Sequence, residues 1–444
     1  MRKIVASIGL AAVGATGLQG ASVPEMLGAE GSKPWSISAT LRGFYDDNIN
    51  TVKSGDPNKK DTLGLEVSPS IAVNWAMPQT TLVASYTYSV TKYERAPVDN
   101  GNNDYDQTHN FSVALDHQFT TRYRVNVKDS FVVGQEPDFL RAGNAFTTFQ
   151  RVSGENLRNA GSITFSAQIT RLLELEFGYA NAFFDYADEG ADYGPGFINP
   201  SRSGLLDRFE HTFHLDTRWQ VKPQTVVVVG YQFRQVNYIG NEDIAVDPSI
   251  PGSYLKSSDR DDREHYFYLG ADHTFRPDLS GSVRIGGRYV DYYKDPTGSG
   301  VGNGFGPYAM GSLHWVYAPE SFVEAGVSHD LNTTDELSVQ GNSFTRNEES
   351  TVFYATINHR ITPKLSASFT GQFQNSTFDG GANNSRSERY FLAGLQLEYQ
   401  FNPSFSAQIG YNYDWLDSDA NVGGVASARS FDRNRIYVGV TARY

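Results

Sequence analysis

Apolar and polar residues alternate strictly along extended stretches of this chain, most clearly near its C-terminus. In the segment 404–416 every second residue is apolar, and the residues between are polar or glycine. The apolar positions are Phe405, Ala407, Ile409, Tyr411, Tyr413 and Trp415, and the others are Ser406, Gln408, Gly410, Asn412 and Asp414. Successive side chains of a β-strand point to opposite faces, so the segment is predicted to be a strand with one apolar face.

The same alternation recurs from Trp35 to the C-terminus. It predicts about 18 strands of about 10 to 14 residues, the length that a tilted strand needs to cross a bilayer. Segments 137–160 and 239–260 could hide or lose a strand, which keeps about 16 strands as an alternative. The expected spans are 35–47, 61–76, 80–94, 106–119, 121–135, 156–169, 171–186, 205–221, 225–238, 261–275, 278–293, 306–317, 321–332, 349–361, 364–378, 387–401, 404–416 and 430–444.

The connections between these segments alternate in length. Many short ones contain proline, which belongs in turns because it cannot donate a hydrogen bond within a sheet. Those prolines are Pro78, Pro223, Pro277, Pro319, Pro363 and Pro403, whereas the long, polar connections are 187–204, 239–260, 294–305, 333–348 and 417–429. Short turns at one end and long loops at the other predict an all-β, transmembrane, antiparallel up-and-down β-barrel, with periplasmic turns and extracellular loops.

The N-terminus has the features of an export signal. Met1-Arg2-Lys3 is followed by an apolar run to Leu18 and by small residues at 20–22. Residues 1–22 are therefore predicted to be a cleaved signal peptide. A short periplasmic segment, 23–34, and the barrel, 35–444, would follow. The mean hydropathy of −0.43 is compatible with strands that are apolar on one face only.

The last predicted strand distinguishes a membrane barrel from a soluble sheet. Its apolar parity is Ile436, Val438, Val440, Ala442 and Tyr444. A final strand ending on an aromatic residue resembles the C-terminal signal of bacterial outer-membrane proteins, which the barrel-assembly machinery recognises. Aromatic residues make up 13% of the chain, as suits the aromatic girdles of a membrane barrel. The expected location is the cell outer membrane.

The first strand and its loop read Leu41-Arg42-Gly43-Phe44-Tyr45-Asp46-Asp47-Asn48-Ile49. This run resembles the opening strand of the Gram-negative outer-membrane β-barrel porin family, whose members match over most of the mature chain. The resemblance implies a channel for passive diffusion of small hydrophilic solutes, and it indicates no substrate. Two alternatives stay open: a non-conducting barrel whose long loops bind a surface partner, and a barrel that exports a polysaccharide.

If the apolar parity faces lipid, the other parity lines the lumen and carries both charge signs. An 18-strand ring is too wide for side chains alone to fill, which favours a water-filled channel over a packed lumen. An inward-folded loop, 137–160 or 239–260, is the expected constriction. The predicted pore-lining charges are Arg42, Asp116, Arg124, Lys128, Glu174, Glu176, Glu210, Asp216, Arg218, Arg234, Asp272, Arg284, Arg288, Glu324, Arg360, Glu398, Asp414 and Arg435.

The net charge of −13 argues against a nucleic-acid partner and, because the loops hold the acidic surplus, favours weak cation preference. Tyrosines recur on the polar parity near the outer mouth and could stack on sugar rings. The alternative places them in the external aromatic girdle, through a register slip of one residue. They are Tyr266, Tyr268, Tyr308, Tyr354, Tyr390 and Tyr437.

Residues with catalytic potential do not assemble into a motif. The chain has no cysteine, and no serine motif accompanies its histidines. The sequence therefore predicts no enzyme activity, no cofactor and no metal site. The expected partners are outer-membrane lipid and lipopolysaccharide, the barrel-assembly machinery, with Tyr444 as the assembly signal, and small hydrophilic solutes. Whether the chain is a monomer or a trimer is left open.

Overall fold

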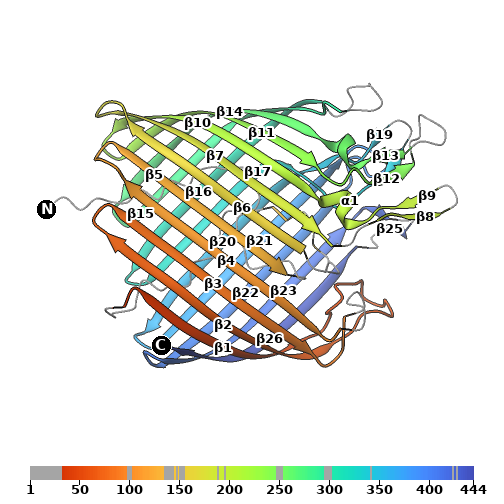
Figure 1. Cartoon of the computed structure of the whole chain (residues 1–444), viewed down its shortest axis with the longest axis horizontal. Coiled ribbons are helices and arrows are strands. Elements are labelled where there is room, and N and C mark those ends of the chain that lie inside the picture. Colours follow the sequence, from red (N-terminus) through yellow and green to blue (C-terminus); the bar gives the residue numbers. More distant parts are fainter. Residues whose placement is uncertain are drawn as a thin grey trace.

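The computed structural model describes residues 33–97, 103–134, 145–146, 149, 156–187, 190–194, 197–246, 254–294, 303–340, 343–422, 425–426 and 429–444. Its main feature is one closed sheet of 18 antiparallel strands (Figure 1). The wall strands are β1 (Trp35–Asp46), β2 (Thr62–Met77), β3 (Thr80–Tyr93), β4 (Tyr105–Gln118), β5 (Tyr123–Gly134), β6 (Asn156–Gln168), β7 (Leu173–Tyr186), β10 (Arg208–Lys222), β11 (Thr225–Tyr238), β14 (Asp262–Arg276), β15 (Leu279–Asp291), β16 (Gly304–Ala318), β17 (Ser321–Asn332), β20 (Asn347–Thr362), β21 (Leu365–Asp379), β22 (Ser387–Asn402), β23 (Phe405–Ser418) and β26 (Phe431–Arg443).

Each wall strand pairs with its neighbours in chain order, and β1 pairs with β26 to close the ring. All the strands expected from the alternation are present, with ends that differ by a few residues. The count of 18 is confirmed and the alternative of 16 is not. The described part of the connection 239–260 contributes no wall strand. Most of 137–160 before β6, like the predicted signal peptide and most of segment 23–34, lies outside the described residues.

The pleat of the strands separates an apolar outer face from a polar lumen. Leu269 is 63% exposed on the outside, whereas Gln232 on the lumen side is fully buried. Val229, Leu395 and Ile409 also lie on the outer face, as expected from their parity. The expected lumen positions Gly270, Gln396 and Gln408 lie on the opposite parity. Unlike a soluble domain, the barrel therefore has a polar interior and directs its large apolar side chains outward.

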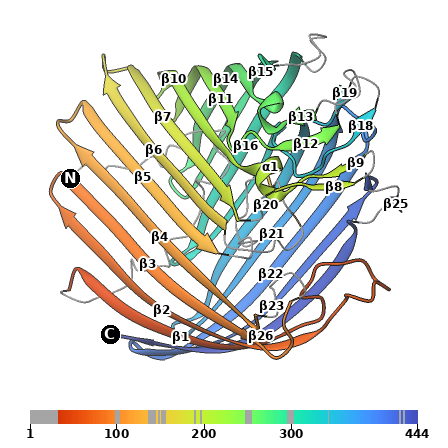
Figure 2. The same ribbon diagram turned by 45° about the vertical axis from the view of Figure 1, so that its right-hand side comes forward.

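The two ends of the barrel differ. The C-terminus and the start of β1 lie at the end with short turns, where the Ile37 amide donates to the Tyr444 carbonyl at 3.1 Å. Small elements gather at the other end (Figure 2). They are β8 (Asp192–Gly194), β9 (Phe197–Asn199), α1 (Arg202–Leu206), β12 (Asp243–Val246), β13 (Tyr254–Lys256), η2 (Ser257–Arg260), β18 (Val339–Gln340), β19 (Ser343–Phe344), β24 (Asn421–Val422) and β25 (Val425–Ala426).

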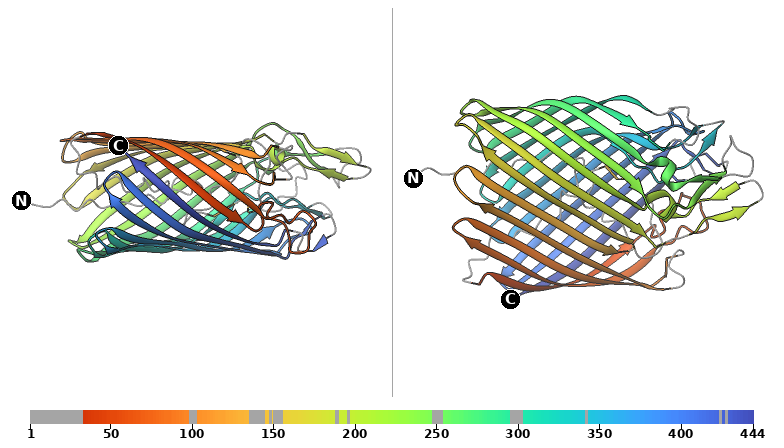
Figure 3. Two further views of the ribbon diagram at one scale, coloured as in Figure 1. Left: turned by 90° about the horizontal axis from the view of Figure 1, so that it is seen from below. Right: turned by 45° about the horizontal axis from the view of Figure 1, so that its top comes forward.

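The ring is not circular. The two views of Figure 3, drawn at one scale, show a flattened barrel that is wider in one direction than in the other. Flattening shortens the path across the lumen, so side chains and loops can reach from one wall toward the other. Among the residues that the structure describes, no helix has the length and apolar character needed to span a membrane.

Candidate functional site

The lumen wall holds all the predicted pore-lining charges, because each lies on the parity opposite the exposed apolar positions. The charge is distributed unevenly around the ring. From β7 to β17 the acids outnumber the arginines. The acids there are Glu174, Glu176, Glu210, Asp216, Asp262, Glu264, Asp272, Glu324 and Asp330, and the arginines are Arg208, Arg218, Arg234, Arg284 and Arg288.

A network of ion pairs organises the acidic wall. Arg218 contacts Glu174 at 3.3 Å and Asp272 at 2.9 Å, and Arg284 contacts the other oxygen of Asp272 at 2.8 Å. Further toward the loops, Arg234 is fully enclosed and pairs with Glu264 at 2.7 Å. Each of the five arginines pairs with at least one carboxylate, and Arg218 and Arg284 share Asp272. Because the acids outnumber the arginines, the wall keeps a surplus of acids facing the lumen.

The opposite stretch of wall, from β26 to β6, is basic. It contains Arg42, Arg124, Lys128, Arg158, Arg433 and Arg435 on lumen positions, with fewer acids between them. Arg42 pairs with Glu66 at 3.3 Å, and its guanidinium lies 4.6 Å from the centre of the Tyr437 ring. The two walls carry opposite net charge, so an electric field runs across the lumen. Such a field orients polar solutes and does not select strongly between cations and anions.

The predicted tyrosines face the lumen and not the lipid, and several cover glycines. A Cβ added at Gly230 would lie 2.1 Å from Tyr268, one at Gly410 2.2 Å from Tyr437, and one at Gly326 2.6 Å from Tyr354. The rings therefore lie flat against neighbouring backbone, as aromatic residues do when they cover glycine in a sheet.

Most of these tyrosines are also covered on their other side. Tyr266, Tyr268, Tyr308, Tyr390 and Tyr437 are each buried, whereas Tyr354 is partly exposed. The Tyr266 hydroxyl donates to Asp330 at 3.0 Å and the Tyr268 hydroxyl to Asp216 at 2.6 Å. As placed, they brace the wall, and Tyr354 is the one with ring surface open to the lumen.

The connection between β5 and β6 sends two described phenylalanines into the lumen. The Phe146 amide donates to Gln374 Oε1 at 2.8 Å, and Gln374 Nε2 donates to the Phe146 carbonyl at 2.9 Å. Phe149 is 1% exposed and packs with Tyr390, Leu392, Leu416 and Phe431. β5 and β6 lie almost opposite β21 and β22 in the ring order, so these contacts cross the barrel.

Loops from three connections pack together over the mouth at the loop end. Leu205 and Leu206 of α1, Ile244 of β12, Leu255 of β13 and Phe344 of β19 form one buried apolar cluster. The cluster continues onto lumen-facing side chains at the end of β7. We call this assembly the cap. It extends into the barrel mouth and is not a set of separate surface loops.

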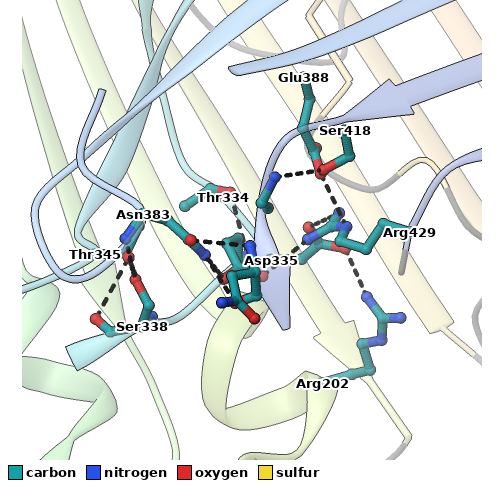
Figure 4. Close-up of polar contacts among 12 residues, drawn as sticks. Arg202, Thr334, Asp335, Ser338, Thr345, Asn383, Glu388, Ser418 and Arg429 are labelled. Carbon is teal, nitrogen blue, oxygen red and sulfur yellow. Dashed lines mark hydrogen bonds and ion pairs between the residues drawn. The ribbon is translucent and has the colours of Figure 1, made fainter. Parts of the chain in front are cut away.

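Two buried arginines, Arg429 and Arg260, brace the cap. Arg429 contacts Asp335, Glu336 at 3.4 Å and Glu388 at 3.1 Å (Figure 4). Arg202, the first residue of α1, reaches Asp335 at 2.6 Å and so ties a second loop to the same carboxylate.

Arg260 of η2 uses backbone acceptors instead. It is fully buried and donates to the carbonyls of Leu205 at 3.0 Å, Thr334 at 2.8 Å and Arg346 at 3.0 Å. The connection that holds Arg260 is therefore tied by one cation to two others, the connection that contains α1 and the connection between β17 and β20.

Burial and charge shift the pKa values of the cap carboxyls in opposite directions. Burial, reinforced by the neighbouring Asp335 and Glu388, raises the pKa of Glu336 to about 7 despite Arg429. Burial alone would raise the pKa of Asp335, but Arg429 and Arg202 hold it below its usual value. Burial also raises the pKa of Asp207, the residue after α1, to about 7.

We expect the cap to become more stable as the pH falls from about 8 to about 5, because carboxyls with raised pKa values favour the folded state when protonated. Their contribution is present below their usual pKa and is lost as the pH rises through about 7. The test is limited proteolysis of the loops at both pH values, with the wild type compared with Glu336→Gln. The variant should show a weaker pH dependence, and equal pH dependence in both would contradict the assignment to Glu336.

The seam that closes the barrel uses residues whose role the sequence did not indicate. Arg433 of β26 pairs with Asp46 of β1 at 2.6 Å, and the Asn434 side chain donates to Asp47 at 2.7 Å. Asn48 Nδ2 donates to the Asp432 carbonyl at 2.8 Å. The sequence feature that could have indicated this seam is a pair of polar runs, 46–48 at the end of the first strand and 432–434 at the start of the last.

The histidines lie mostly on the outer face. His109, His211 and His265 each pair with a tyrosine hydroxyl on the neighbouring strand, at 2.8, 2.9 and 2.9 Å respectively. Within the described residues, no group of three or more side chains could hold a metal ion.

The chain has a distant likeness to several solved structures. OccAB4 of Acinetobacter baumannii is 12% identical with a TM-score of 0.40, and the alignment covers 93% of this chain and 99% of that one. OpdK of Pseudomonas aeruginosa, in a structure with vanillate, is 12% identical with a TM-score of 0.43 and coverage of 92% and 99%. The ferric enterobactin receptor PfeA of Pseudomonas aeruginosa is 10% identical with a TM-score of 0.44 and coverage of 93% and 81%.

A comparison with curated protein sequences found no match. The sequence profile of the family described as "Putative beta-barrel porin 2" matches residues 36–444. The description of the family names its members as β-barrel porins. The match spans nearly the whole chain and includes every wall strand. The chain therefore belongs to this family of outer-membrane β-barrel porins.

Proposed function

We propose that the chain is a passive outer-membrane channel for small hydrophilic solutes and has no catalytic activity. The observation that carries this proposal is the lumen itself, a closed ring whose interior is polar and whose two walls differ in charge. A ring of this size needs polar filling or water inside it, and the charged positions are suited to a hydrated path. Phe146 and Phe149 would narrow that path, because they cross the lumen to Gln374 and Tyr390.

The hydroxyl-rich lining of β1–β4 favours neutral polyhydroxy solutes, including saccharides. Its lumen positions are rich in hydroxyl groups, some of which pair across strands, such as Ser85 with Ser112 at 2.7 Å and Thr87 with Ser70 at 2.9 Å. A wall of hydroxyls can exchange hydrogen bonds with a sugar as it moves. The hydroxyl-bearing positions are Ser36, Ser38, Thr40, Ser68, Ser70, Thr81, Ser85, Thr87, Ser89, Thr91, Thr108 and Ser112.

A second candidate function is a barrel whose cap binds a surface partner and does not open. The observation that favours it is the burial of the cap, in which Arg260 and Arg429 each join several loops. A stable cap presents a constant surface at the cell exterior. Conductance separates the two candidates, because only the channel passes current.

Purified protein in a planar bilayer should give discrete conductance steps with weak cation preference at low salt. The acids of β7–β17 raise the local cation concentration, and salt screens this effect, so the preference should fade toward about 1 M salt. The reversal potential across a salt gradient measures it. Phe149→Ala should raise the conductance, with lipid-facing Phe391→Ala as the matched control. Absence of current, or strong anion preference, would contradict the proposal.

Saccharide passage has its own test, which is block of the single-channel current by oligosaccharides. Tyr354→Ala should weaken the block, because that ring is partly open to the lumen. Tyr308→Ala removes a buried ring and should therefore weaken the block less. Lack of block in the wild type would leave small hydrophilic solutes in general as the substrate class.

The route to the membrane is part of the proposal. Residues 1–22 would be removed as a signal peptide, and lipopolysaccharide would surround the loop end. Tyr444 lies 76% exposed at the turn end, 6.0 Å from the Trp35 ring, where it is accessible as an assembly signal for the barrel-assembly machinery.

A further inference from the structure

A polar patch interrupts the apolar outer face of the barrel on β5–β7. Asp129 points outward from the middle of β5, between the outward-facing Val127 and Phe131. Its cross-strand neighbours on that face are Val113 of β4 and Gly161 of β6. Carboxylates directed at acyl chains are rare in membrane proteins, because lipid tails offer no hydrogen-bond partner.

Two asparagines from the next two strands join Asp129. Asn159 Nδ2 donates to Asp129 Oδ1 at 3.0 Å and to the Ser130 carbonyl at 3.2 Å. Asn181 of β7 stands opposite Gly161. A Cβ added at Gly161 would lie 2.9 Å from Asn181 Oδ1 and 3.1 Å from Asp129 Oδ1, so both side chains converge over the glycine.

We infer that this patch, formed by Asp129, Asn159, Gly161 and Asn181, is a contact surface between two copies of the chain in the membrane. The patch contains both hydrogen-bond donors, the asparagine amides, and acceptors, the carboxylate and amide oxygens. A two-fold axis through it would place donors of one copy against acceptors of the other. Glycine at its centre lets two backbones approach closely, and polar side chains hold membrane segments together when lipid is the alternative.

Other occupants fit this patch less well. Acyl chains cannot satisfy its polar groups. On the opposite wall, the middle of the outer face of β22 and β23 presents apolar side chains such as Leu395 and Ile409, which are 49% and 47% exposed. The polar face of β5–β7 is therefore suited to a protein partner, and its self-complementarity points to a second copy.

The chain has no cysteine, so a single introduced thiol can report contacts between copies without background. Asn181→Cys, treated with a bis-maleimide in intact outer membranes, should give a covalent dimer of the chain. Leu395→Cys, exposed to lipid on the opposite wall, is the matched control and should give several-fold less dimer. In mild detergent, the wild type should have the mass of an oligomer and the double variant Asp129→Leu, Asn181→Leu that of a monomer.

Heat-modifiable mobility shows whether each variant is a folded barrel. If the double variant fails to fold, the comparison of cross-linking between Asn181→Cys and Leu395→Cys still tests the inference, because each of those chains carries a single substitution. Equal cross-linking of Asn181→Cys and Leu395→Cys would overturn the inference, as would a monomeric mass for the wild type. Cross-linking of Asn181→Cys to a protein of another mass would also overturn it, in favour of a different partner.

Discussion

Ile409→Arg is expected to reduce sharply the amount of folded barrel in the outer membrane, whereas Gln408→Arg should leave assembly nearly unchanged. Ile409 is 47% exposed on the outer face of β23, and Gln408 beside it faces the lumen. An arginine directed at the bilayer interior costs roughly 2–4 kcal/mol, whereas one directed at a polar lumen keeps contact with polar groups. The measurement is the fraction of heat-modifiable folded species, together with urea unfolding of refolded protein in vesicles.

The pair is informative because the two residues are adjacent and receive the same substitution. Ile163→Arg against Thr164→Arg repeats the test on the distant strand β6 and guards against an effect peculiar to β23. Normal assembly of Ile409→Arg with failure of Gln408→Arg would mean that the two faces of the barrel are reversed.

Arg429→Met is expected to open the cap while the barrel wall stays folded. The substitution removes the cation that Asp335, Glu336 and Glu388 share, and leaves three carboxyls in a buried site. Removing one partner of a buried ion pair costs roughly 3–5 kcal/mol. That cost falls on the loops, since the wall is held by its own strand pairing. Faster proteolysis of the loops and a larger single-channel conductance should result.

Arg386→Met is the matched control, because Arg386 is an exposed arginine in the loop that precedes β22. The defect of Arg429→Met should shrink at acid pH, since carboxyls with raised pKa values take up protons there and lose their mutual repulsion. If Arg429→Met left both proteolysis and conductance at wild-type values, the cap would not depend on this arginine.

Local pattern was sufficient to predict the wall of this protein. A strand has a period of two, so the alternation that ends in Ile409, Tyr411 and Tyr413 already assigns those side chains to one face. The prolines in the short turns, such as Pro403, mark where consecutive strands reverse. Because each wall strand pairs with its neighbour in the chain, the order of the ring follows from the order of the segments, and so does the lumen position of Arg218 or Glu174.

The contacts inside the lumen and over its mouth could not be predicted in this way. Phe149 meets Tyr390 across the barrel, and Arg429 joins Asp335 to Glu388, although these residues are far apart in the chain. Loops have no periodic pattern that records which other loop they contact. The ring of Tyr268 likewise lies over Gly230 of the neighbouring strand, a contact that its own segment of sequence does not indicate.

By itself, then, the sequence determined the strands, their faces and the closed barrel, because period-two alternation and turn chemistry are local properties. The tertiary structure alone decided which lumen groups pair, how the cap is braced and where Asp129 meets the asparagines. These features depend on strand stagger and loop packing, which bring together residues that no local rule connects.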